Sequence, residues 1–130
     1  MLQWSEEYSI GNVRIDLQHE AFFGLMNEFE ANRLAGCDKD KLYRTLKEMY
    51  LFVAFHFYSE ENLMVDIGYP DIKAHKMQHQ VLLELLNKKV IGFDVGEYHA
   101  KDIEDFLLNW FIKHAMQEDV KIGKYLIDEY

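Results

Sequence analysis

Apolar side chains recur along most of the chain at steps of three and four residues, the period of an α-helix with one buried face. Three short polar or glycine-containing connections interrupt the pattern. Four amphipathic helices are therefore expected, with bounds of about 16–36, 39–65, 70–90 and 95–127. Because the connections are short, they predict an all-α fold, an antiparallel up-down-up-down four-helix bundle.

Local signals set the ends of these helices. We expect the first helix to begin near Asp16, a favoured N-cap residue, and to stop at Gly36. Pro70 fits the first turn of the third helix. Asp94, followed three residues later by Glu97, resembles a capping box that would open the fourth helix. Residues 1–15 predict an extended arm whose apolar side chains pack on the domain.

Composition narrows the class of protein. A chain of 130 residues, 49% of them hydrophobic, suits a single domain with one substantial core. The formal charge of −9 argues against nucleic acid or an anionic membrane as a partner, because both attract basic surfaces. The N-terminus lacks the features of a signal peptide, and no apolar stretch is long enough to span a membrane. The single cysteine, Cys37, cannot form an internal disulfide. We therefore expect a soluble, cytoplasmic monomer without membrane insertion.

Histidines gather on the faces that the helical pattern turns inward. Each expected helix contributes at least one of them, and His99, among charged residues, is the exception expected at the surface. Two acidic side chains follow inward histidines on the second and fourth helices. The candidate metal ligands are His19, His56, Glu60, His75, His79, His114 and Asp119.

Two pairs in this set have the spacing of a chelate. His56 with Glu60, and His75 with His79, are four residues apart, so each pair lies on one helical face. A lone histidine on an apolar face is more often a core residue bonded to a neighbour. Burying the whole set in one small core would cost several kcal/mol unless the groups were paired or bound metal.

The number of donors indicates more than one ion. Seven ligands exceed the four of a zinc site, whereas two ions that share bridging carboxylates would use them all. Imidazole with carboxylate suits iron, manganese, copper or zinc. One spacing leaves alternatives open, because His114 and Asp119 are five residues apart, about 140° on a regular helix. A π-type widening would align them; otherwise Asp119 reaches from an adjacent turn, or Glu118 is the ligand.

The order of these residues resembles the hemerythrin family. The matching groups, one to each helix, are His19, His56-x-x-x-Glu60, His75-x-x-x-His79 and His114-x-x-x-x-Asp119. Three N-terminal motifs are similar to the single-domain bacterial branch, the bacteriohemerythrins: Trp4-Ser5, Tyr8-Ser9-Ile10-Gly11 and Asp16-x-Gln18-His19. The resemblance covers essentially the full chain and favours Asp119 over Glu118 as the ligand.

This resemblance implies a non-haem di-iron centre, with two iron ions joined by an oxo or hydroxo bridge. One iron would be held by His75, His79 and His114. The other would be held by His19 and His56, while Glu60 and Asp119 bridge the two. This arrangement leaves one open position, on the iron with two histidines, where dioxygen can bind.

The resemblance also implies an apolar pocket over the open position, which would keep water from the centre. The matching aromatic positions are Phe22, Phe23, Phe57, Trp110 and Phe111. Gln18 and Asp16, next to His19 in the sequence, are candidate partners that hold its ring.

The expected function is reversible dioxygen binding, for oxygen transport, storage or delivery to an oxygen-consuming enzyme, and not catalysis. Oxygen or redox sensing would need a protein partner. A di-iron peroxidase or oxidase would want a second open position or a proton-delivering acid. Iron storage would want a carboxylate-lined route to the site. The remaining alternative is a metal-free bundle with buried histidines.

Overall fold

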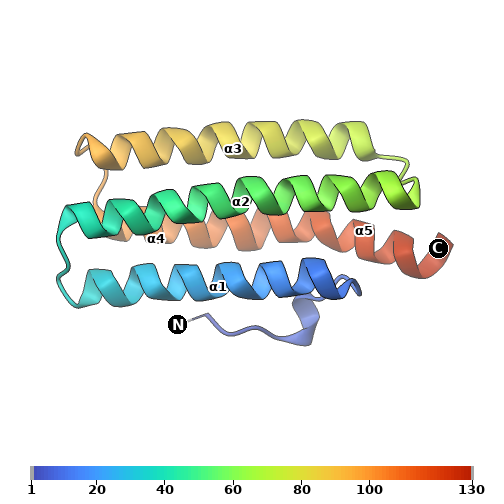
Figure 1. Cartoon of the computed structure of the whole chain (residues 1–130), viewed down its shortest axis with the longest axis horizontal. Helices are drawn as coiled ribbons and strands as arrows, with labels where there is room; N and C mark the ends of the chain where they lie inside the picture. The colour runs from blue at the N-terminus through green and yellow to red at the C-terminus, as the bar shows by residue number, and fades with distance from the viewer. Residues whose placement is uncertain (1, 130) are drawn as a thin grey trace.

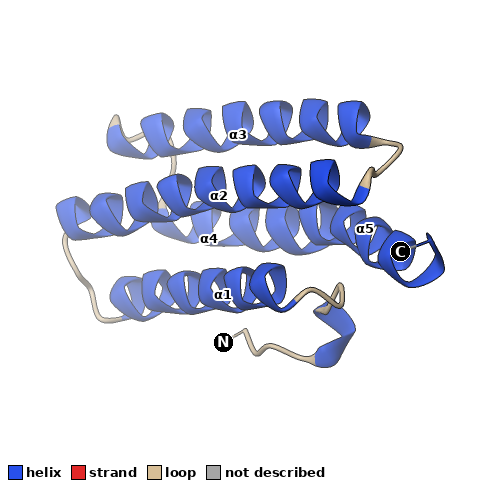
Figure 2. Cartoon of the chain, turned by 45° about the vertical axis from the view of Figure 1, so that its right-hand side comes forward, coloured by secondary structure: helices blue, strands red, loops and turns tan. Residues whose placement is uncertain are grey.

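Four antiparallel helical rods make up the molecule, each joined to the next by a short loop (Figure 1). The computed structural model describes residues 2–129, apart from the side chains of residues 113–115. The first three rods are α1 (Val13–Leu34), α2 (Lys39–Ile67) and α3 (Ile72–Asp94). The fourth consists of α4 (Ala100–Leu107), a π-helical segment (Leu108–Ala115) and α5 (Met116–Glu129). The described residues contain no strand (Figure 2), and the expected all-α four-helix bundle is confirmed.

The start of α1 differs from the expectation. The helix begins at Val13, and its N-cap is Asn12, whose side chain accepts a hydrogen bond from the Ile15 backbone N–H at 3.0 Å. Asp16 instead accepts bonds from the Ser9 hydroxyl at 2.6 Å and from the Ile10 backbone N–H at 2.8 Å. Its carboxylate therefore fixes the N-terminal arm against α1 and does not cap the helix.

The connection between α3 and α4 also lies elsewhere than expected. Helix α3 continues to Asp94, because burial of Phe93 in the core extends it by another turn, so the capping box expected at Asp94 and Glu97 is wrong. The fourth rod begins at Ala100, where the Asp102 carboxylate accepts a bond from the His99 backbone N–H at 3.2 Å. His99 is exposed, as its charged neighbours indicated.

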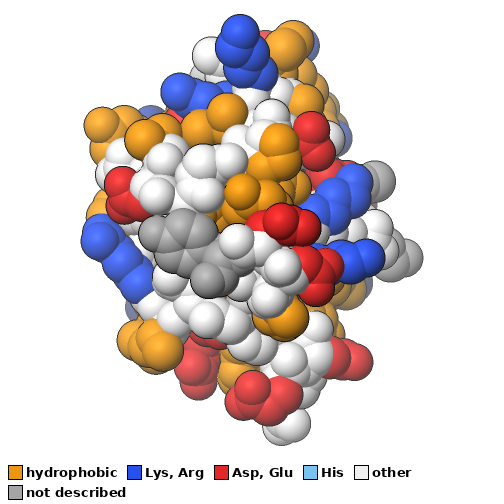
Figure 3. All heavy atoms as spheres, turned by 90° about the vertical axis from the view of Figure 1, so that its right-hand side faces the viewer, with side chains coloured by type: hydrophobic (Ala, Val, Ile, Leu, Met, Phe, Trp, Pro, Cys, Tyr) orange, Lys and Arg blue, Asp and Glu red, His pale blue; other side chains and the backbone are white. Residues whose placement is uncertain are grey.

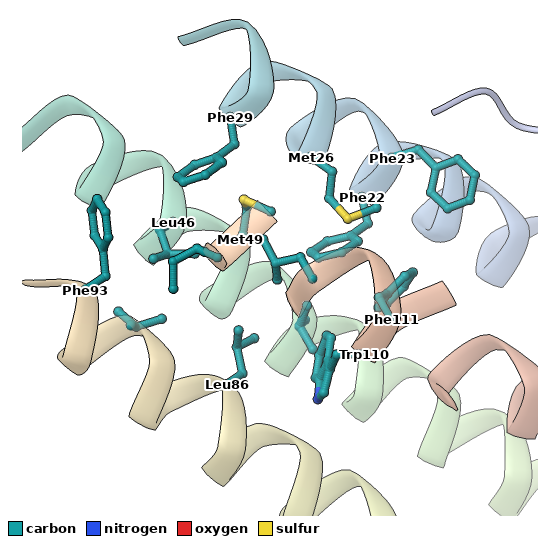
Figure 4. Packing of buried hydrophobic residues seen from close by; sticks show 14 of the residues in the cluster. Phe22, Phe23, Met26, Phe29, Leu46, Met49, Leu86, Phe93, Trp110 and Phe111 are labelled. Atoms are coloured by element: carbon teal, nitrogen blue, oxygen red, sulfur yellow. The ribbon is translucent and has the colours of Figure 1, made fainter. Parts of the chain in front are cut away.

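The apolar core consists of two clusters. In the larger one, side chains from all four rods point toward one another (Figure 4). The smaller one contains Ile10, Ile15, Met64, Ile67, Tyr69 and Ile122. Along α1, Ile15 belongs to the smaller cluster and Phe22 to the larger, so His19 lies between them. The same alternation places Glu60 of α2 between Phe57 and Met64, which gives the bundle a polar layer between two apolar ones.

Among the described residues, no helix combines the length and the apolar character that crossing a membrane requires.

Gly123 holds the arm close to α5, and its replacement tests that contact. A Cβ atom there would lie 2.7 Å from the Ile10 carbonyl oxygen, closer than carbon and backbone oxygen tolerate. We expect Gly123→Ala to destabilise the protein by about 1–3 kcal/mol in denaturant unfolding, as overpacking does.

Gly24→Ala is the matched control, because Gly24 is also inside a helix but a Cβ there meets nothing within 4 Å. Alanine's better helix propensity should stabilise this variant by about 0.5–1 kcal/mol. Equal shifts for the two variants would contradict close packing of the arm on α5.

Candidate metal centre

The polar layer brings together six of the seven expected ligands, those whose side chains are described. They come from α1, α2, α3 and α5, and none is more than 4% exposed: His19, His56, Glu60, His75, His79 and Asp119. The space-filling view of the bundle end that carries the C-terminus shows acidic, basic and hydrophobic side chains, and no histidine among the described residues is visible on it (Figure 3). Because these six side chains are buried, the layer is shielded from solvent.

The donor atoms form two groups, and within each group they all lie within 4.8 Å of one another. One group contains His19 and His56, and the other contains His75 and His79. Glu60 and Asp119 belong to both groups. The arrangement therefore has two positions that can each hold a cation, with two shared carboxylates.

Each shared carboxylate divides its oxygens between the groups. Glu60 Oε1 lies 2.7 Å from His75 Nε2 and 3.1 Å from His79 Nε2, whereas its Oε2 faces His56 Nε2 at 3.4 Å. Asp119 Oδ2 lies 2.9 Å from His19 Nε2, and its Oδ1 lies 3.3 Å from His75 Nε2. One oxygen toward each group is the geometry of a bridging carboxylate.

The π-helical segment bears on the five-residue spacing that the sequence left open. His114 lies within Leu108–Ala115, and its side chain lies outside the described residues, so its part as a ligand stays a prediction. A π-helical widening, one of the alternatives that the spacing left open, is present in the segment that contains His114. Asp119 is 1% exposed among the histidines, whereas Glu118 is partly exposed and bonds Lys121 at 2.9 Å. Glu118 is therefore outside the site.

Charge is balanced inside the metal-free layer. Burial lowers the pKa of His56 and of His75, but the adjacent Asp119 and Glu60 carboxylates outweigh it and raise both to about 9. Burial and mutual repulsion would raise the pKa of Glu60, yet the surrounding imidazoles hold it below its usual range, and the pKa of Asp119 is lowered well below its usual range. Protonated imidazoles thus provide the positive charge that the two buried carboxylates need.

Two buried atoms show that hydrogen bonds alone do not satisfy the polar groups of this site. Glu60 Oε2 and His19 Nδ1 have no hydrogen-bond partner among the described side chains. In addition, the Nε2 atoms of His19 and His56 face each other at 3.0 Å, although a proton can satisfy that contact in one direction at a time. Nitrogen lone pairs and carboxylate oxygens converging on one point suit a metal ion, so the residues fit a pair of cations.

The five expected pocket aromatics are all buried but differ in what their rings contact. The Phe111 ring meets the His19 ring at 5.7 Å and the Phe22 ring at 4.2 Å between centroids. Phe57 stacks flat on His79 at 3.9 Å, and Trp110 adjoins Phe57.

Phe23 faces the other way. Its ring packs on Tyr8 and Trp4 of the N-terminal arm, with centroids at 5.3 and 6.0 Å. Of the two alternatives after His19, Phe22 is thus the one near the imidazoles.

Two side chains outside the ligand set hold ligand rings. Gln18 Oε1 lies 2.7 Å from His56 Nδ1, so Gln18 supports His56. Its position next to His19 in the sequence had suggested His19 as its partner. Glu61 Oε2 lies 2.8 Å from His79 Nδ1. Glu61 was not among the residues predicted from the sequence, although an acidic residue directly after a ligand glutamate is a signal for such a partner. Asp16, the other expected partner of His19, serves the arm instead.

Comparison with known proteins gives a consistent result. The profile of the hemerythrin family, described as the hemerythrin HHE cation binding domain, matches residues 11–126. A bacteriohemerythrin of Clostridium acetobutylicum is 29% identical over 125 residues, covering 92% of this chain and 96% of its own. A hemerythrin-like protein of Naegleria gruberi is also 29% identical, over 91% of this chain and 87% of its own.

A solved structure agrees with the sequence relatives. The crystal structure of a leucine-to-phenylalanine mutant superposes with a TM-score of 0.84 at 26% identity, and covers 95% of both chains. Fold, buried donor set and family profile thus coincide over the same residues. The chain belongs to the hemerythrin family, whose bacteriohemerythrins it resembles over most of its length.

Proposed function

We propose that this chain binds dioxygen reversibly at a non-haem di-iron centre, for oxygen transport, storage or delivery to an oxygen-consuming enzyme. The observation that carries the proposal is the division of the Glu60 and Asp119 oxygens between two histidine groups. When bound, two irons would supply the electrons and the open coordination position that reversible dioxygen binding requires.

The residues would divide the work between the two positions. His75 and His79, joined by His114, would fill the coordination of one iron. His19 and His56 would hold the other, which has fewer imidazoles and therefore keeps a position free. Both bridging carboxylates would keep the two ions at a fixed separation, because each comes from a helix packed in the core.

Aromatic side chains would keep water from the free position. Phe111 contacts both His19 and His56, at 5.7 and 6.3 Å between ring centroids, and is 1% exposed. Phe22 packs against Phe111 from behind at 4.2 Å. This wall consists of hydrocarbon rings and contributes no proton-donating acid, which favours release of intact dioxygen over peroxide chemistry.

Metal analysis combined with an optical spectrum tests the proposed function. We expect two irons per chain and a visible band that appears in air and disappears under nitrogen over repeated cycles. His79→Ala should retain fewer than two irons, because one ligand is lost. Irreversible bleaching, or steady turnover of added peroxide, would favour an enzyme, and one iron per wild-type chain would remove the di-iron centre altogether.

Truncating Phe111 tests the aromatic wall. Phe111→Ala should leave iron content unchanged and speed the irreversible oxidation of the centre by about tenfold, as water gains access to the His19 and His56 side. Phe29→Ala is a matched control, because Phe29 is equally buried but packs on Phe93 in the larger cluster. Both variants should lose about 3–5 kcal/mol of stability. If they oxidise at the same rate, the wall is assigned to the wrong residue.

The pKa shifts predict how stability of the metal-free protein depends on pH. The pKa values of His56 and His75, about 9, exceed the ordinary value of 6.5, so their stabilisation is complete below pH 6.5 and is lost as pH rises through 9. Glu60, with an ordinary pKa of 4.5, and Asp119, with one of 3.8, have lowered values, so their stabilisation is lost in acid.

The metal-free protein should therefore be most stable between pH 4.5 and 6.5, and its Tm should fall from pH 6.5 to 9. Thermal scans across this range measure the effect. Metal-loaded protein should not show the fall, because its ligand nitrogens carry no proton to lose. A flat Tm profile for the metal-free protein would contradict the charge balance described above.

A further inference from the structure

Two ligand imidazoles are held at the ring nitrogen that faces away from the site, and their partners differ in charge. His56 Nδ1 lies 2.7 Å from the amide oxygen of Gln18, and His79 Nδ1 lies 2.8 Å from the carboxylate of Glu61. Both partner oxygens can only accept, so each Nδ1 keeps its proton, and Nε2 is the nitrogen that gives up a proton and offers its lone pair when a metal binds. Both partners therefore fix the same tautomer.

The electronic effect of the two partners is unequal. A carboxylate that accepts a hydrogen bond from Nδ1–H makes the imidazole a more basic ligand, whereas a neutral amide does so much less. Among the described residues, the ion-pair partner of Glu61 is His79, so no lysine or arginine there offsets its charge. In the His19 and His56 group, Gln18 is neutral, and no side chain that the structure describes bonds His19 Nδ1.

We propose that Glu61 and Gln18 are positioning residues that make the two metal positions unequal, so that a divalent ion binds the His75 and His79 position first and more tightly. The His19 and His56 position then fills second and holds its ion more weakly. The weaker position is the one beside Phe111. The inference rests on the proposed two-metal site, and it does not depend on dioxygen binding.

Titration of the metal-free full chain with Co²⁺ tests this order without any measurement of activity. The wild-type protein should bind two ions in two classes of different affinity. Glu61→Gln keeps an acceptor for His79 Nδ1 but removes its charge, so the tighter class should weaken by about tenfold or more while the weaker class is unchanged. In a His56→Ala background, where one class remains, Glu61→Gln should weaken that class by the same factor.

The reciprocal exchange gives an independent measurement. Gln18→Glu places a carboxylate against His56 Nδ1, so the weaker class should tighten and the difference between classes should narrow. This variant tests the inference even if Glu61→Gln does not fold, which far-UV circular dichroism of each metal-free protein would reveal.

Glu118→Gln is the matched control for net charge. It removes a negative charge one residue from Asp119, but Glu118 bonds Lys121 and none of the ligand rings that the structure describes, so neither class should change. Equal weakening by Glu118→Gln and Glu61→Gln would overturn the inference, as would an unchanged tight class in Glu61→Gln. Binding of a single Co²⁺ by the wild type would instead overturn the two-metal site itself.

Discussion

Two carboxylates buried at the centre of an apolar bundle are the constraint on which the rest of the structure depends. Glu60 is 0% and Asp119 1% exposed, and an uncompensated buried carboxylate would cost several kcal/mol. Positively charged groups must therefore lie next to these carboxylates in the core. In the metal-free protein it comes from protonated His56 and His75, and in the loaded protein it would come from the cations. Removing either source leaves the core with unpaired charge.

The apolar layers on both sides explain how so polar a centre coexists with a folded bundle. On α1, Ile15 of the smaller cluster precedes His19 and Phe22 of the larger cluster follows it, and on α2 Phe57 and Met64 lie on either side of Glu60. Helix positions are thus fixed above and below the polar layer by packing that involves no charge. The ligands arrive at one level because the apolar residues hold each helix in register.

Periodicity explains why much of the site could be predicted from the sequence. A spacing of four residues has a single meaning on a helix, so His56 with Glu60 and His75 with His79 were readable as pairs. Residues five apart do not share a face of a regular α-helix. The π turn before Met116 depends on local backbone geometry that cannot be predicted from any one residue type. The start of α1 was misjudged for a related reason, since Asn12 and Asp16 are both good caps and the arm determines which one is free.

The outer partners could not be predicted because neighbours in sequence serve different ligands in space. Gln18 directly precedes His19 on α1, yet its amide reaches across to His56 on α2. Glu61 adjoins Glu60 on α2, yet its carboxylate reaches His79 on α3. Each of these bonds joins two helices while it orients a ligand. These two bonds therefore belong both to an interface between helices and to the surroundings of the metal centre, so a substitution that breaks one of them also changes the donor strength of a particular histidine.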